Sequence, residues 1–115
     1  MKSIHSVTLG ILACLSLSAC GTVEITKTGR GFNNPTNPST VDILMTVPRR
    51  PYEELGIFRA SGFMKSETAV MHNAIRTKAA ELGANAALIT DTGLAPERPG
   101  GTPLLFANGV ALKWK

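Results

Sequence analysis

The sequence predicts a small α+β domain of β-β-α-β-β order, in which one helix packs on a mostly antiparallel sheet. Two observations predict it. Residues 66–82 carry apolar side chains at helical spacing, and short apolar segments with the composition of strands lie on both sides of them. A leader and a stretch rich in Gly, Asn and Pro come first, so we expect the globular domain to span residues 41–115.

A proline-rich break separates the first two predicted strands. Residues 41–47 and residues 52–61 both have the composition of strands, and Pro48 and Pro51 between them lack the backbone donors that a strand needs. Because the connection is short, we expect the two strands to pair antiparallel.

The helix is the clearest element of the sequence. Ser66 is a suitable N-cap, and Gly83 follows the last turn as a residue that can adopt positive φ. Between them, apolar residues recur at spacings of four, four and three: Met71, Ile75, Ala79 and Leu82.

The chain after the helix predicts two further strands. Residues 85–90 form the first, and residues 91–103, rich in Gly and Pro, form a loop. The end of the chain fits either a hairpin turning at Asn108-Gly109 or, as we favour, one long strand with a bulge at Gly109. The predicted core consists of Val41, Ile43, Met45, Leu55, Ile57, Met71, Ile75, Leu82, Leu88, Leu112 and Trp114.

The first 19 residues predict a secretory signal. A charge at Lys2 and a short apolar run precede Leu17-Ser18-Ala19-Cys20, and the run is too short to span a membrane. This stretch resembles a bacterial lipobox, which implies cleavage before Cys20 and acylation of that residue. An ordinary signal peptide and a buried first helix are the alternatives. In similar Gram-negative lipoproteins, Gly21 in place of Asp favours the outer membrane, so we expect a lipid-anchored protein on its periplasmic face.

Residues 20–40 are predicted to be a lipidated, flexible tether. Gly, Asn, Pro, Ser and Thr dominate them, and a flexible chain of this length spans roughly 25 Å. The alternative is that residues 22–26 add to the sheet as an edge strand.

Composition excludes several classes of function. Cys14 leaves with the signal and Cys20 is taken by the lipid, so the mature chain has no thiol for a disulfide, a nucleophile or a metal site. The formal net charge of +4 is dispersed along the chain, and export contradicts binding to nucleic acid.

The junction between the helix and the third strand resembles a known group. Residues 74–89 read AIRTKAAELGANAALI. They are similar to the "LGANA" junction of small bacterial envelope proteins, which include lipoproteins of the Rcs stress-sensor type and the YbjQ-type domains named for heavy-metal binding. The resemblance implies a small α+β domain, and it suggests metal or small-anion binding as an alternative function. The stress sensor depends on disulfides, which the mature chain cannot form.

The sequence predicts no catalytic, cofactor-binding or metal-binding residue. The only histidine after the signal, His72, has no ligand spacing with Asp42, Asp91 or Glu67. Adjacent residues of a strand face opposite sides, which separates Glu53 from Glu54. The remaining candidates fit commoner structures. We expect Asp91-Thr92-Gly93 to form a turn and Arg49-Arg50 to lie in a solvated loop. We therefore expect a non-enzymatic module that binds an envelope protein or itself and is held at the membrane by the lipid on Cys20.

The lipid anchor predicts a simple labelling result. Radiolabelled palmitate should be incorporated into the wild-type chain, and Cys20→Ser should lose the label because the acylated thiol is gone. Label retained in the variant, or absent from the wild type, would contradict the anchor.

Overall fold

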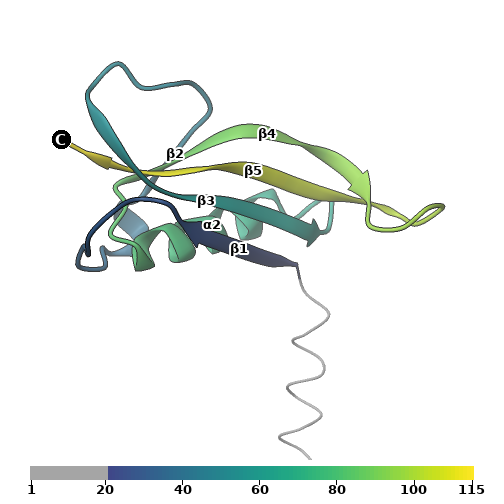
Figure 1. Ribbon diagram of the computed structural model, residues 1–115. Helices are drawn as coiled ribbons and strands as arrows, with labels where there is room; N and C mark the ends of the chain where they lie inside the picture. The colour runs from purple at the N-terminus through teal and green to yellow at the C-terminus, as the bar shows by residue number, and fades with distance from the viewer. Residues whose placement is uncertain (1–20) are drawn as a thin grey trace, which may run out of the picture.

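The computed structural model describes residues 21–115, and it consists of one helix packed against one face of a five-stranded sheet (Figure 1). This confirms the predicted fold class. The predicted signal peptide and Cys20 lie outside the described residues. Within residues 21–115, no helix is long and apolar enough to cross a membrane.

The sheet is mixed, and its last strand in sequence is its central strand. Across the sheet the order is β1-β3-β5-β4-β2, with β2 parallel to β4 and every other pair antiparallel. The helix α2 connects β3 to β4, which run parallel to each other on either side of β5. The elements are β1 (Thr22–Lys27), η1 (Pro38–Thr40), β2 (Asp42–Leu44), β3 (Tyr52–Phe63), α2 (Thr68–Glu81), β4 (Ala86–Pro96) and β5 (Pro103–Trp114).

The final strand, β5, is continuous, which confirms the favoured prediction of one long strand in place of a hairpin at Asn108-Gly109. The irregularity lies in its neighbour, because the register of β4 shifts between Ile89 and Asp91 and makes Thr90 the extra residue. Gly109 is nevertheless required. A Cβ at this position would lie 2.0 Å from the carbonyl oxygen of Leu88 and 2.6 Å from Cζ of Phe58.

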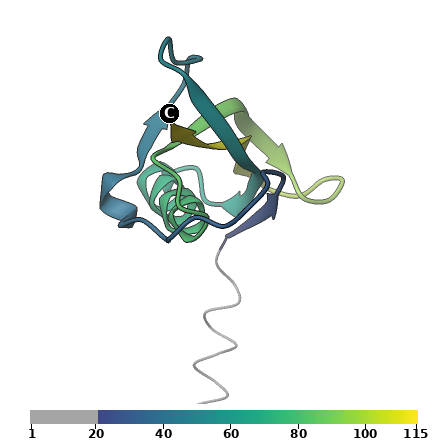
Figure 2. The ribbon, with the colours of Figure 1, turned by 60° about the vertical axis from the view of Figure 1, so that its left-hand side comes forward.

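The main core lies between α2 and the sheet, whose strands curve round the helix in Figure 2. On the side facing α2, the middle of β5 offers only small residues, Ala107, Gly109 and Ala111, while Leu105 packs against the core nearer the start of the strand. Phe58 of β3 and Met71 and Ile75 of α2 are buried in this region and supply the volume that β5 lacks.

Most of the predicted core is confirmed. Two predictions are wrong, because Met45 and Ile57 are 58% and 46% exposed. Met45 follows the end of β2, and Ile57 faces away from the helix because a register shift at Leu55 inserts an extra residue into β3. The buried predictions are Val41, Leu55, Met71, Ile75, Leu88 and Leu112, and the partly buried ones are Ile43, Leu82 and Trp114.

The predicted antiparallel pairing of residues 41–47 with residues 52–61 is wrong. β2 has only three residues and pairs parallel with β4, whereas β3 pairs with β1 and β5. The residues between β2 and β3, with their two prolines, carry the chain from one side of the sheet to the other.

Two element boundaries also differ from the prediction. Much of the loop expected over residues 91–103 is strand, because β4 continues along β5 as far as Pro96. The helix has Glu67, not Ser66, at its N-cap position. At its other end Gly83 has φ of +84°, as expected, and a Cβ there would lie 2.6 Å from Asn33 Cβ.

Residues 20–40 are predicted to be a flexible tether, but the chain from residue 22 to residue 40 packs on the domain. Its first part is the edge strand β1, the alternative left open, which buries Val23 against the helix side of the sheet. The amides of Thr28 and Gly29 then donate to the carbonyl of Leu55 at 3.0 and 3.1 Å. Further on, the amide of Thr36 donates to Ala80 O at 2.9 Å, so backbone hydrogen bonds fix this stretch at several points.

The close approach at Gly109 predicts a stability effect. Gly109→Ala should lower the free energy of unfolding by about 1–3 kcal/mol, because the new methyl group overlaps a carbonyl oxygen in the neighbouring strand. Gly93→Ala is the control, since its Cβ would meet only the edge of the Phe106 ring, at 3.3 Å. Urea unfolding measures both, and equal stability of the two variants would contradict the packing described here.

Candidate functional site

The helix covers one face of the sheet, and the opposite face is closed at only one end. There, Ala86, Leu88 and Leu112 form a second small apolar cluster, covered in part by Tyr52 and Trp114. The guanidinium carbon of Arg50 lies 4.3 Å from the centroid of the Trp114 ring, a cation–π contact. Further along the same face no other layer is present within the described chain, and Ile57 is exposed.

A row of polar side chains crosses the middle of this open face. Glu24, Arg59, Asn108 and Asp91 are successive partners across β1, β3, β5 and β4. Directly opposed residues of antiparallel strands project from the same face, so the four side chains form one line across the sheet. Its two carboxylates lie at the two ends of the row, on β1 and β4, and its one cation, Arg59, lies between them on β3.

Beyond this row the open face is hollowed into a groove of about 510 Å³. Leu104 and Phe106 of β5 supply apolar surface, and Glu24, Arg59 and Glu97 add charged groups. The pairing of β3 with β5 is irregular there: the register shifts between Ala60 and Phe63, around Gly62 with φ of +80°. The β4–β5 hairpin continues past the end of β3 (Figure 1).

The groove combines the chemical groups of a binding surface. A guanidinium can bind a carboxylate in two places at once, and the aromatic ring beside it can bury apolar atoms. Its lining contains neither histidine nor cysteine. Among residues 21–115 no three His, Cys, Asp or Glu side chains are grouped so that they could hold a metal ion.

The residues weighed as metal ligands lie on separate elements. His72 is half-buried on α2, where burial and, to a lesser extent, the charge of Arg76 lower the pKa of its ring below the ordinary value of 6.5. Glu67 precedes the helix and accepts a hydrogen bond from the amide of Met64 at 2.7 Å. Asp42 is on β2 and Asp91 on β4, and the structure brings neither of them into a group with His72.

The other motifs have structural explanations. The turn expected at Asp91-Thr92-Gly93 is not formed. These residues are part of β4, where Thr92 Oγ1 donates to the carbonyl of Phe106 at 2.8 Å. Glu54 accepts a hydrogen bond from Thr28 Oγ1 at 2.9 Å. Of Arg49-Arg50, expected in a solvated loop, Arg50 packs on Trp114.

Sequence reasoning missed the groove and the role of Arg59 in it. The available signal was a single charge inside an apolar strand, Ile57-Phe58-Arg59-Ala60. It places Arg59 on one face of the strand, but the partners on β1 and β5 depend on pairings between distant segments.

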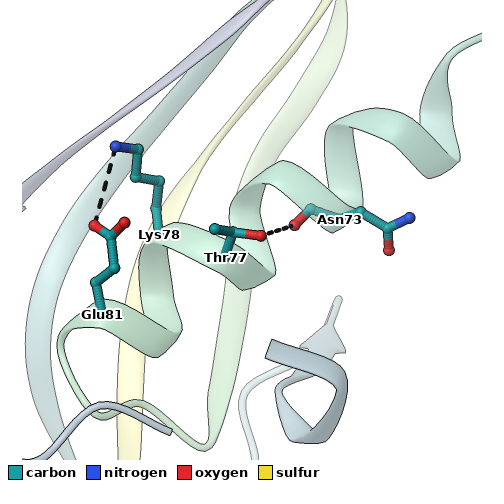
Figure 3. A network of polar contacts seen from close by, with 4 residues as sticks. All are labelled: Asn73, Thr77, Lys78 and Glu81. Carbon is teal, nitrogen blue, oxygen red and sulfur yellow. Dashed lines mark hydrogen bonds and ion pairs between the residues drawn. The ribbon is translucent and has the colours of Figure 1, made fainter. Parts of the chain in front are cut away.

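The outer side of α2 is an ordinary solvated surface (Figure 3). Thr77 Oγ1 donates to the carbonyl of Asn73 at 3.0 Å, and Lys78 Nζ lies 4.0 Å from Glu81 Oε2. An exposed ion pair of this kind contributes about 0–1 kcal/mol. Thr77 and Lys78 border a hollow of about 420 Å³ beside β1, whereas Glu81, with a side chain 58% exposed, lines neither that hollow nor the groove and is a suitable reference position.

Comparison with known proteins identifies the fold. The sequence matches no protein-family model and no curated protein. The structure is similar to the crystal structure of the Francisella virulence factor FvfA, with a TM-score of 0.61 and 15% sequence identity. The match covers 79% of this chain and 96% of that chain. At this identity, the similarity concerns the fold and not the activity.

Proposed function

We propose that this protein is a lipid-anchored lipoprotein of the bacterial envelope that binds another envelope protein and catalyses no reaction. The motif Leu17-Ser18-Ala19-Cys20 supports the anchor, and Gly21 supports the outer membrane. The observation that carries the binding role is the groove on the open face of the sheet, where exposed apolar surface and charged groups lie together.

The composition of the groove favours a protein as its ligand. Arginine and aromatic residues are enriched where proteins bind one another, and here Arg59 and Phe106 share one hollow. The neighbouring edge of the sheet is also open, because β2 pairs only with residues 86–88 of β4. An extended segment of a partner can lie along such an edge while its side chains enter the groove.

The resemblance to stress-sensor lipoproteins and YbjQ-type domains gives the envelope role some support. Its physical content is the tight return of the chain at Gly83, after which Ala84, Ala86 and Ala87 are fully buried. Binding of a metal or small anion, as in the YbjQ-type group, is the alternative function. A rise in melting temperature on adding Zn²⁺ or phosphate would favour it.

Photocrosslinking in whole cells tests the binding role. Benzoylphenylalanine replaces Phe106 in the groove or, as the control, Glu81 on the solvated side of α2. We expect position 106 to crosslink one envelope protein that position 81 does not, and Arg59→Glu to weaken that crosslink because it reverses the charge beside the aromatic ring. Identical products from both positions, or a crosslink unaffected by Arg59→Glu, would contradict the proposal.

A further inference from the structure

We infer that the end of the domain where β1 begins rests directly on the lipid bilayer, with Met64, Val70 and Leu94 at the boundary between headgroups and acyl chains. This inference rests on the proposed lipid anchor at Cys20. It adds an orientation and a second contact with the membrane, made by the folded domain itself.

The first step is the distance between the anchor and the sheet. Thr22 already pairs with Ser61, and a Cβ at Gly21 would lie 2.6 Å from Cγ of Phe63, so Gly21 sits tightly against the fold. Consecutive Cα atoms are about 3.8 Å apart. The proposed lipid site is the residue bonded to Gly21, and residues 22–40 do not form the spacer of roughly 25 Å expected for a flexible tether.

The second step is the chemistry of the surface around this point. Met64, in the connection from β3 to α2, and Val70, in the first turn of α2, are 55% and 53% exposed. Val70 is one turn before Ala74, which lines a hollow of about 420 Å³ together with Gly21 and Thr22. Apolar surface therefore adjoins the residue that follows the anchor.

A third exposed apolar residue lies at this end on β4, two strands away from β3. Leu94 of β4 pairs with Leu105 of β5, which pairs in turn with Phe63. Two strand spacings, about 10 Å, thus separate Leu94 from the residue that packs against Gly21. The long side chain of Lys65, next to Met64, is exposed and can extend to lipid phosphates while the apolar groups enter the boundary.

The position of the anchor decides which end faces the bilayer. Met45 and Val47 are also exposed, but they precede β3, whereas β1 begins opposite the end of β3. From Tyr52 to Ser61 the strand spans about 30 Å. A lipid attached beside β1 therefore brings one end to the membrane and holds the other away from it.

The groove lies at the membrane end. A Cβ at Gly62, which lines it, would lie 3.5 Å from Gly21 Cα and 2.7 Å from Glu97 Oε1. A partner that fills the groove thus binds beside the bilayer surface, which favours a protein embedded in the same membrane.

Depth-dependent fluorescence quenching tests this orientation. The mature, acylated protein, which begins at Cys20 and has lost Cys14 with the signal, has no free thiol, so Val70→Cys and Met64→Cys can each be labelled with one fluorophore and reconstituted in vesicles containing brominated lipids. Val47→Cys is the control, because Val47 is 66% exposed at the far end. We expect the labels at 64 and 70 to lose more than about half of their fluorescence, because interfacial burial of this kind places them within reach of the bromines. The label at 47 should be unaffected.

The outcomes separate the orientation from the anchor. Palmitate on the chain with equal quenching at all three positions would overturn the orientation and leave the anchor intact. A chain without palmitate would contradict both the orientation and the anchor.

Discussion

The close packing of β5 against its neighbours is the constraint on which the rest of the fold depends. This strand pairs with both β3 and β4, and between residues 107 and 111 its helix side carries only Ala107, Gly109 and Ala111. Phe58 and the helix can therefore come close to its backbone, and a single added methyl group at Gly109 would overlap the carbonyl of Leu88. Without cysteines in the domain, packing of this density must hold the sheet together.

The sheet also determines how the domain can meet its surroundings. Because α2 covers one face and a small apolar cluster closes one end of the other, the open surface that remains is the polar row and the groove beyond it. Pairing of β1 with β3 also holds the chain immediately after the predicted lipid site on the sheet. The groove and the predicted anchor therefore belong to the same end of the molecule.

Local patterns in the sequence predicted what depends on neighbouring residues. Helical spacing located α2, and Gly83 marked its end. At Asn108-Gly109 the local signal was that of a hairpin, and the long strand was favoured because it completes the β-β-α-β-β sheet. Errors arose where the structure depends on distant segments. A register shift at Leu55 turned Ile57 outward, and β2 paired with β4 across the sheet instead of with the strand that follows it. The groove could not be predicted for the same reason, since residues of β1, β3, β4 and β5 all line it.

Hydrogen exchange of the acylated protein in vesicles tests whether the chain from residue 22 onward is part of the sheet. The amides of Thr28, Gly29 and Thr36 donate to backbone carbonyls of β3 and α2, and β1 pairs along its length with β3. We predict that these amides and those of β1 that face β3 exchange far more slowly than in an unstructured peptide. Exchange at the unstructured rate throughout residues 22–36 would contradict the account, because it would restore a flexible tether between the anchor and the domain.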